Sequence, residues 1–340
     1  ALALIVTDQD TKVVELARGY RIGLSGAVLP VLWFAILRNF VAVLSQTISI
    51  LVISIAAVGL NYLLTLWFVY GGFGLVPMGL FGAGLATTLV SWFMFFALLA
   101  HVYRKTLFRN YGIFRSKWQL HWPLCREILW LGLPVAGLTF LEAGLFAATS
   151  ILSGVIGAKT LAASEITVAW IGIPFVIALG LAEATMIRVA HAIGRNSLPE
   201  ARRIGFLGMT LVIGITASMV AVPLLFAEQI ILIFISPDDP GYDRVSTLAT
   251  QFLAIGALFM VFDALQAAAA RALRGMKDNL APLWIAGFGY WILGIGGVSI
   301  LSFYYELDGV GLWWGLAAGL AVAACLLTLR FHRLTRPVTA

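Results

Sequence analysis

Two carboxylate side chains lie deep inside apolar stretches of this sequence, where an ionised group is costly. Asp263, in FMVFDALQAAAARALRGMKDN, is the only charged residue from 245 to 270. Glu142, in LPVAGLTFLEAGLFAATSIL, stands 16 residues from Arg126 and 17 from Lys159. Placing an ionised carboxylate at bilayer depth costs from about 2.5 to more than 10 kcal/mol. Carboxylates in such positions usually face a cavity and take part in function.

The two carboxylates suit the reversible binding of a cation or a proton. Burial opposes ionisation, whereas a bound cation favours it, so protonation and cation binding are alternative ways to relieve the charge. We predict that Glu142 and Asp263 face one polar cavity close enough to share an ion. Nearby aromatic faces can hold an organic cation, although such residues often pack or face lipid instead. The predicted substrate cavity comprises Phe140, Phe146, Trp170, Phe259, Phe262 and Gln266.

Two further carboxylates, Glu165 and Glu183, lie in one apolar run. Glu165 stands beside Ser164 near the expected outer end and Glu183 lies toward the inner end, so we interpret both as interfacial. Asp263 has its own alternative, because Arg271 follows eight residues later, about 12 Å by helical rise. A structural pair with this arginine competes with the cavity interpretation.

The composition indicates the elements that position these residues. Hydrophobic residues make up 61% of the chain and charged residues 11%, with a mean hydropathy of +0.98, whereas soluble domains carry about 25% charge. Strands of alternating hydrophobicity, typical of outer-membrane barrels, are absent from the sequence. We therefore expect an all-α membrane protein. Nine apolar runs are long enough to span a bilayer as helices: 13–41, 48–70, 80–103, 127–156, 160–192, 201–227, 245–270, 280–304 and 309–331.

The basic residues predict an orientation. If the segment before residue 13 is outside, 17 of the 22 Lys and Arg residues fall on the inner side, and the exceptions are Lys12, Arg18, Arg21, Lys159 and Arg244. The positive-inside rule then predicts a multi-pass protein of the inner (plasma) membrane with a cytoplasmic C-terminus. Anionic membrane lipid is the expected partner of this charge. No basic stripe typical of nucleic-acid binding is evident, so we expect no nucleic-acid partner.

An internal repeat with an offset of 232 residues divides the chain. It pairs Val13, Leu16, Ala17 and Tyr20 with Val245, Leu248, Ala249 and Phe252, and Gly79, Leu80 and Phe81 with Gly311, Leu312 and Trp313. Chance similarity between apolar helices is the alternative. We predict three domains: a partial N-terminal lobe of three helices (1–105), a cytoplasmic linker (106–126) and a six-helix lobe (127–340). Subtracting 232 from the second repeat's start predicts opening helices about a hundred residues before Ala1.

Three segments carry a resemblance to a known family. FLEAGLFAATSIL around Glu142, IRVAHAIGRN at 187–196 and FDALQAAAARALRGMKDN around Asp263 resemble the second lobe of multidrug and toxic compound extrusion (MATE) transporters, in particular the bacterial NorM-like branch. The resemblance implies two six-helix lobes and an antiporter that expels organic cations in exchange for Na⁺ or H⁺. It also implies that Glu142 and Asp263 form the coupling-ion site. This chain has Phe259 where similar proteins often carry a Tyr.

Other functions fit the residues less well. A lipid-linked oligosaccharide flippase of the same superfamily needs deep basic residues to hold pyrophosphate, whereas the deep residues here are acidic. A non-transporting fragment is a further alternative. No HExxH, GxSxG or GxxxxGK[ST] motif occurs, so we expect neither an enzyme nor direct use of ATP. Two isolated cysteines, Cys125 and Cys325, indicate neither a disulfide framework nor a metal cluster. We expect a monomer without cofactors, apart from the coupling ion.

Overall fold

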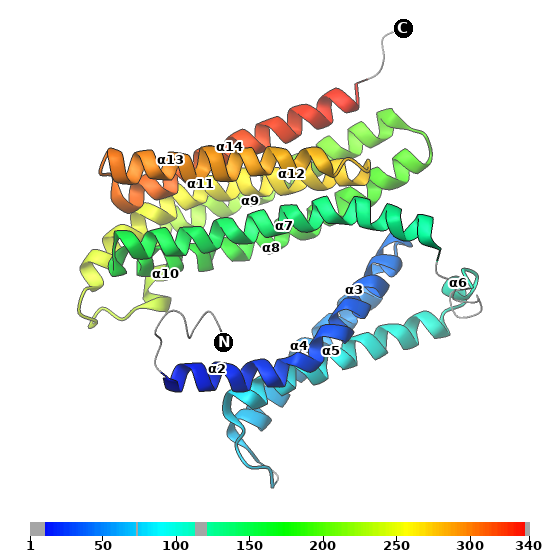
Figure 1. The fold of residues 1–340 in the computed structure, drawn as a ribbon, viewed down its shortest axis with the longest axis horizontal. Helices are drawn as coiled ribbons and strands as arrows, with labels where there is room; N and C mark the ends of the chain where they lie inside the picture. Colours follow the sequence, from blue (N-terminus) through cyan, green and yellow to red (C-terminus); the bar gives the residue numbers. More distant parts are fainter. Residues whose placement is uncertain (1–10, 73, 113–120, 337–340) are drawn as a thin grey trace. The chain divides into compact units, whose positions relative to one another are not determined.

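The computed structural model describes residues 11–72, 74–112 and 121–336, and this part of the chain is almost entirely helical (Figure 1). It divides into two compact units, residues 1–119 and 120–340. The division falls inside the predicted linker 106–126, of which residues 113–120 lie outside the described residues, as do the first ten residues. Apart from an isolated bridge between Gly72 and Leu75, the described residues form no β-structure.

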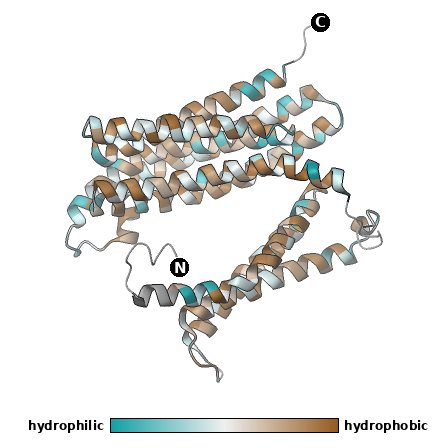
Figure 2. Ribbon diagram, viewed as in Figure 1, coloured by the Kyte–Doolittle hydropathy of each residue, from teal (hydrophilic) through white to brown (hydrophobic). Residues whose placement is uncertain are grey.

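The predicted all-α membrane class is confirmed. Among the described residues, nine helical stretches are long and apolar enough to cross a membrane, and each overlaps one predicted run. Figure 2 shows hydrophobic residues along most of their length and hydrophilic residues mainly toward their ends. The stretches are Ala17–Val43, Thr47–Tyr70, Gly79–Arg104, Trp122–Ile156, Ala158–Gly194, Leu198–Leu225, Tyr242–Gly275, Leu280–Tyr304 and Asp308–Leu334.

The first unit is a small bundle around α5. Its elements are α2 (Thr11–Leu24), the 3₁₀ turn η1 (Ser25–Ala27), α3 (Val28–Val43), α4 (Thr47–Tyr70), α5 (Gly79–Arg104) and the short α6 (Thr106–Arg109). Helices α2 and α5 cross closely, because a β-carbon on Gly23 would lie 2.5 Å from the carbonyl oxygen of Phe81. At the other end, buried Val41, Leu98 and Phe108 join α3, α5 and α6.

The second unit is a larger bundle in which α11 is the central helix. Its elements are α7 (Trp122–Ile156), α8 (Ala158–Gly194), α9 (Leu198–Leu225), α10 (Ala227–Phe234), α11 (Tyr242–Gly275), α12 (Leu280–Ala286), η2 (Gly287–Ile295), α13 (Gly296–Val298), η3 (Ser299–Tyr304) and α14 (Asp308–Leu334). Helix α11 packs against α8, α9 and α14 and is buried along most of its length. Helices α7 and α8 continue through Pro134 and Pro174. Residues on α11 are therefore withdrawn from the unit's surface.

Small residues bring α14 close to the helical stretch 280–304. A β-carbon on Gly319 would lie 2.6 Å from the Cα of Gly294, and one on Gly315 would lie 2.8 Å from the carbonyl carbon of Gly297. Gly311, Gly315 and Gly319 thus form a stripe of small residues that allows close helix contact. The facing stretch contains two π-helical segments, η2 and η3, a rare conformation that often occurs at functional sites.

The two units share a helical order at the predicted offset of 232 residues. Adding 232 to the span 11–43 gives 243–275, which is α11, and adding it to 47–70 gives 279–302, which runs from α12 into η3. The same addition to 79–104 gives 311–336, which overlaps α14.

The turn between the first two spans of each repeat is also the same. Ser45 has a φ of 59° and Lys277, 232 residues later, a φ of 63°. The backbone N–H of Ser45 donates to Ala42 at 2.9 Å, and that of Lys277 donates to Arg274 at 2.9 Å. Conservation of an uncommon left-handed turn at one offset supports a true repeat over chance similarity.

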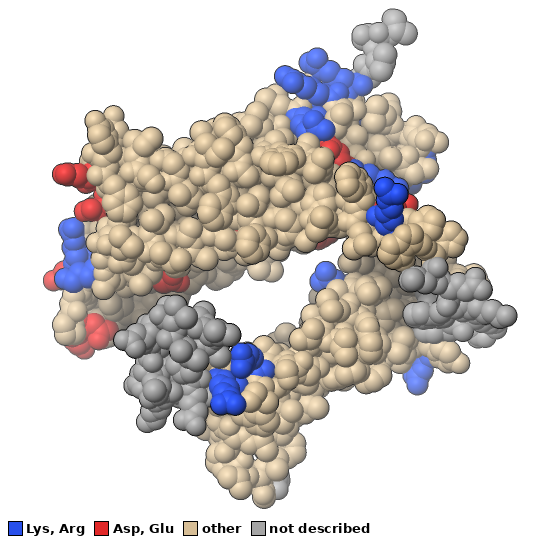
Figure 3. Space-filling model, viewed as in Figure 1, with Lys and Arg blue, Asp and Glu red and all other residues tan. Residues whose placement is uncertain are grey.

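In the second unit, charged side chains divide between the two ends. On the face seen in Figure 3, Lys and Arg gather mainly at the right-hand end of this unit, and Asp and Glu mainly at the left-hand end. The inner end predicted from the sequence holds the ion pairs Lys277–Glu127 at 2.9 Å and Arg330–Asp278 at 2.6 Å.

Candidate functional site

Asp263 lies in the middle of α11 and is almost completely buried. Its exposed fraction is 7%, and its Oδ2 atom has no hydrogen-bond partner among the described residues. Phe259 and Met260, one turn away, are also buried. Burying a polar atom without a partner costs roughly 1–3 kcal/mol. The fold therefore keeps Asp263 in a position that stability alone does not favour.

Glu142 is placed near Asp263 by a different helix. It lies on α7 and is half-buried, and it is close enough for its charge to act on the Asp263 carboxyl group. Gln266 of α11 lies between these groups and the inner end of the helix, and its amide is near the Glu142 carboxyl group. The structure therefore brings together the two predicted ion-binding carboxylates and one predicted cavity residue.

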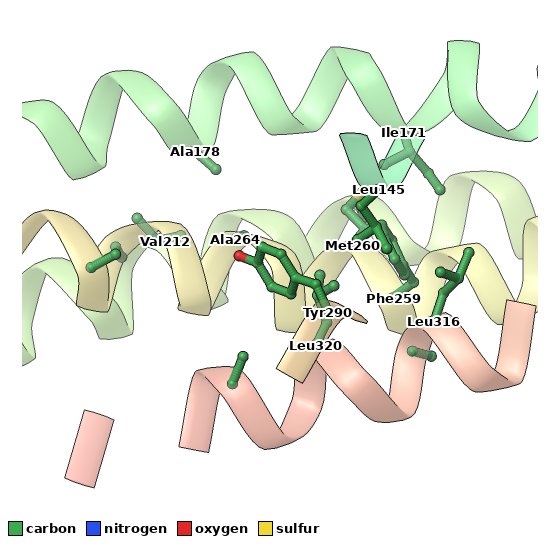
Figure 4. Packing of buried hydrophobic residues seen from close by; sticks show 14 of the residues in the cluster. Leu145, Ile171, Ala178, Val212, Phe259, Met260, Ala264, Tyr290, Leu316 and Leu320 are labelled. Atoms are coloured by element: carbon green, nitrogen blue, oxygen red, sulfur yellow. The ribbon is translucent and has the colours of Figure 1, made fainter. Parts of the chain in front are cut away.

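Tyr290, which sequence reasoning did not select, adds a hydroxyl group to this cluster. It lies on η2, is 1% exposed, and is within range of the charges of Glu142 and Asp263. Figure 4 shows Tyr290 in the same core as Phe259, Met260 and Ala264 of α11. Neither its hydroxyl oxygen nor the Gln266 side-chain oxygen and nitrogen has a hydrogen-bond partner in the described part of the chain.

We refer to Glu142, Asp263, Gln266 and Tyr290 as the carboxyl cluster. Carboxylate, amide and hydroxyl oxygens are the ligand types that hard cations prefer. A cation bound beside Asp263 would satisfy its unpartnered oxygen, and protonation of one carboxylate would relieve the repulsion between the two. The cluster is thus suited to exchange a cation or a proton.

The predicted aromatic residues divide into two groups. Phe146 of α7 contacts Phe259 of α11 with ring centroids 6.4 Å apart, and Phe259 contacts Trp313 of α14 at 5.7 Å. Phe262 is half-buried beside the same core. These rings border the carboxyl cluster on the side toward the predicted outer end.

The other two aromatic predictions lie apart from these contacts. Trp170 of α8 packs at the edge of the core, with its indole N–H buried and unpartnered among the residues described. Phe140 is 75% exposed on α7. Within the second unit, Phe140 therefore lies on the surface rather than in the buried cluster.

Arg271 does not pair with Asp263, so the structural alternative from the sequence is not what the fold adopts. Its Nε instead faces the Oε1 atom of Glu183 at 3.3 Å, and its Nη1 donates to the carbonyl oxygen of Ala267 at 3.3 Å. Glu183 is thus an ion-pair partner on α8 rather than a purely interfacial residue. Glu165 is exposed and accepts a hydrogen bond from Ser150 at 2.6 Å.

The features that the sequence missed depend on how different helices pack together. Tyr290 was an ordinary aromatic residue in an apolar run, and the Arg271–Glu183 pair joins positions 88 residues apart. Nothing in the sequence distinguished Tyr290 from a tyrosine that only packs in an apolar span. No three His, Cys, Asp or Glu side chains gather as a metal site within the described ranges.

Comparison with known proteins places this cluster in a family context. The family model described as MatE matches residues 134–298, which include all four residues of the carboxyl cluster. A probable multidrug resistance protein NorM from Brucella suis biovar 1 is 37% identical over 318 residues, covering 93% of this chain and 67% of that protein. A probable NorM from Mesorhizobium japonicum is 37% identical over 98% of this chain and 71% of its own length.

Solved structures share the fold. The crystal structure of the eukaryotic MATE transporter AtDTX14 matches with a TM-score of 0.84 and 22% identity, covering 98% of this chain and 74% of that one. An outward-facing multidrug resistance MATE family transporter of the MOP superfamily matches with a TM-score of 0.84 and 20% identity, over 97% and 72% of the two chains.

Proposed function

This chain belongs to the MATE family, and from that premise we propose that it exports organic cations in exchange for Na⁺ or H⁺ bound at Glu142 and Asp263. MATE proteins are transporters, so the chain is a multi-pass membrane transport protein and not an enzyme. Relatives at 37% identity are named as multidrug resistance proteins, which supports a role in multidrug efflux.

The observation that carries this proposal is the unpartnered oxygen of Asp263 beside a second carboxylate. Two carboxylates in an apolar core cannot cheaply remain ionised together without a counter-charge. A coupling cation, or a proton, supplies that charge. Gln266 and Tyr290 offer further oxygen ligands. The hydroxyl of Tyr290 replaces the hydroxyl ligand that Phe259 does not provide, at the position where similar proteins often carry a Tyr.

Exchange follows from competition for the same negative charge. An organic cation that enters from the inner side displaces the coupling ion, or its positive charge is balanced by the same carboxylates. The aromatic rings of Phe146 and Phe259 contact its apolar part. The ion returns from the outer side when the organic cation leaves. Each ligand must favour a different facing of the protein, because a ligand shifts an equilibrium only through its differential affinity.

The orientation and organisation proposed for this transporter follow the charge distribution. The N-terminal lobe ends near residue 105, a cytoplasmic linker covers 106–126, and residues 127–340 form the C-terminal lobe. The C-terminus lies in the cytoplasm, and the protein is a monomer in the inner membrane.

A lipid-linked oligosaccharide flippase is disfavoured by the acidic character of the buried cluster, since a pyrophosphate needs cationic partners.

The test is efflux of ethidium from proteoliposomes that contain the protein expressed from its complete reading frame. Sodium and proton gradients are imposed separately. Asp263→Asn should abolish gradient-driven efflux, because the amide keeps the shape but supplies no charge, and Glu142→Gln should impair it comparably. Glu165→Gln is the matched control, since it neutralises an exposed carboxylate that pairs only with Ser150 among the described residues. Normal gradient-driven efflux by Asp263→Asn at equal protein density would refute the proposed ion site.

A further inference from the structure

A cavity outside the carboxyl cluster opens in the first unit, between the inner ends of α4 and α5. Its volume is about 680 Å³. The first turns of α4 contribute Ile48, Ser49, Val52 and Ile53, and the last turns of α5 contribute Ala97, Ala100, His101 and Arg104, with Gln46 and Lys105 beside them. The cavity is large enough for a phosphate group together with the start of an acyl chain.

The lining is polar at one end and apolar at the other. Arg104 and Lys105 lie at the end of α5, and the Lys105 ammonium donates a hydrogen bond to the Gln46 side-chain oxygen. The Nε2 atom of His101 is buried and has no hydrogen-bond partner among the described residues. The positive end of the α4 helix dipole reinforces the basic charge. Deeper in the span, Val52 and Ala97 supply an apolar floor.

The cavity wall faces the exterior of its lobe, because the equivalent surface of the six-helix unit is exposed. Adding 232 to Ile48, Val52 and Ala97 gives Leu280, Trp284 and Leu329, which are 51%, 71% and 51% exposed. This surface therefore stays open even where six helices pack together. In a membrane protein such a surface contacts lipid.

The residues that line the cavity are not repeated in the second unit. Larger side chains stand at the equivalent positions of the second unit, where Trp284 replaces Val52, Leu329 replaces Ala97 and His332 replaces Ala100. The small residues of the first unit leave it open beside a basic rim.

We propose that this cavity binds an anionic phospholipid. The headgroup phosphate lies between Arg104 and Lys105, beside His101, and one acyl chain follows Val52 and Ala97 into the membrane. The charge of the rim selects an anionic headgroup over a zwitterionic one, and the apolar floor selects a lipid over a soluble phosphate. With the orientation proposed above, this lipid belongs to the cytoplasmic leaflet, where basic pockets bind anionic headgroups.

Lipid binding is measurable without transport, so the proposal stands or falls separately from the coupling-ion site. The purified full-length protein in detergent is titrated with dioleoylphosphatidylglycerol, and the bound lipid is counted by native mass spectrometry. Dioleoylphosphatidylcholine, with the same tails, tests the headgroup. Glycerol phosphate, without tails, is added as a competitor. We expect phosphatidylglycerol to bind tightly and phosphatidylcholine to bind more weakly. Glycerol phosphate should not displace bound phosphatidylglycerol.

Three variants localise the site. Arg104→Gln and Lys105→Gln should each weaken binding of the tightest-bound phosphatidylglycerol roughly 5-fold, which corresponds to about 1 kcal/mol per cation. Ala97→Phe fills the apolar floor without changing the charge and should also weaken binding. Arg38→Gln, the matched control, removes an exposed charge from the inner end of α3 and should leave binding within about 2-fold.

Several outcomes would overturn the proposal. Equal affinity for the two lipids would remove the role of the basic rim, and displacement by glycerol phosphate would identify a soluble-phosphate site. The double variant Arg104→Gln, Lys105→Gln and the variant Ala97→Phe would both bind phosphatidylglycerol with unchanged affinity if the tightly bound lipid occupied another part of the protein. That result would overturn the proposed location.

Discussion

Arg271 connects the carboxyl cluster with the inner end of the second unit. Its side chain is only 16% exposed, and its Nη1 bond to the Ala267 carbonyl oxygen turns the guanidinium group along α11 toward Asp263. Its charge reaches both Asp263 and Glu142, while Glu183 holds its Nε from α8. Arg271 is thus an internal cation next to the proposed coupling-ion site, and its ion pair with Glu183 limits how far its charge neutralises the carboxyl cluster.

Removing the Glu183 charge should weaken coupling-ion binding. In Glu183→Gln the guanidinium group of Arg271 loses its ionic partner and neutralises the carboxyl cluster more strongly. We expect the half-saturating concentration of the coupling ion for ethidium efflux to rise roughly 5-fold, the lower end of typical coupling energies. The double variant Glu183→Gln, Arg271→Gln should reverse this rise. Glu165→Gln on the same helix is the control, and an unchanged half-saturating concentration in Glu183→Gln would contradict the competition.

The hydroxyl group of Tyr290 should matter for the ion and not for the apo fold. Tyr290→Phe removes a buried hydroxyl that has no partner among the described residues, so thermal stability without coupling ion should stay equal or rise. If the hydroxyl binds the ion, stabilisation by added ion should fall by about 0.5–1.5 kcal/mol, the worth of one hydrogen-bond-like contact. Tyr304→Phe, at a residue 79% exposed, is the control. Equal ion-induced stabilisation in Tyr290→Phe and the parent would exclude a ligand role.

The sequence identified Asp263, Glu142 and Gln266, and it missed Tyr290 and the Arg271–Glu183 ion pair. Asp263 and Glu142 were recognisable because a carboxylate in an apolar run is costly whatever surrounds it. Tyr290 carries no such signal, since an isolated tyrosine in a span fits packing equally well. The Arg271–Glu183 pair depends on how α8 and α11 are rotated against each other, which hydropathy does not specify.

At the scale of elements, α14 and the π-helical stretch facing it form the closest helix contact near the site. Gly319 and Gly315 allow backbone to approach backbone, and Tyr290 projects from the same π-helical segment η2 into the core. Small residues are the usual means of close packing between membrane helices, where apolar burial gives little driving force. The position of the Tyr290 hydroxyl therefore depends on this contact.

Filling the contact should destabilise the protein. In Gly319→Ala the added methyl group would lie 2.6 Å from the Cα of Gly294, so backbone must move. Overpacking of this kind costs about 1–3 kcal/mol, which lowers the melting temperature by roughly 2–10 °C. The melting temperature can be measured by tryptophan fluorescence during heating, because the chain has 11 Trp residues. Gly296→Ala, with no atom within 4 Å, should be neutral or slightly stabilising, and equal melting of the two variants would contradict the tight packing.

The elements differ in how well the sequence predicts them. The nine spans follow from apolar length, because every backbone polar group in a bilayer must be satisfied within a helix. Their order in the repeat follows from one offset. The π-helical segments η2 and η3 were not predicted, since a shift from i→i+4 to i→i+5 hydrogen bonding leaves no clear mark on hydropathy.

At the scale of the whole molecule, the two copies of the repeat have the same order of helices but not the same polar residues. Subtracting 232 from Asp263, Gln266 and Tyr290 gives Val31, Phe34 and Val58 in the first unit. The helices of the two units correspond in order and even in the turn at Ser45 and Lys277. Three of the four residues of the carboxyl cluster thus have apolar equivalents in the other copy.

The parallel repeat also constrains topology, because equivalent helices must cross the membrane in the same direction. The turn at Asn196, between α8 and α9, then lies on the same side as those at Ser45 and Lys277, with most of the Lys and Arg residues. The loop between α10 and α11, with Asp238 and Asp239, lies on the other side. From the positive-inside rule we predict that the first side faces the cytoplasm.

Labelling of single cysteines in intact cells tests this assignment. In a background with Cys125→Ser and Cys325→Ala, a membrane-impermeant maleimide should label Asp238→Cys before lysis. It should label Arg195→Cys, at a side chain 58% exposed, only after lysis. Labelling of both variants after lysis is the control for accessibility. The reverse pattern in intact cells would place the basic ends outside, and the coupling ion would then enter the carboxyl cluster from the side opposite to the one proposed.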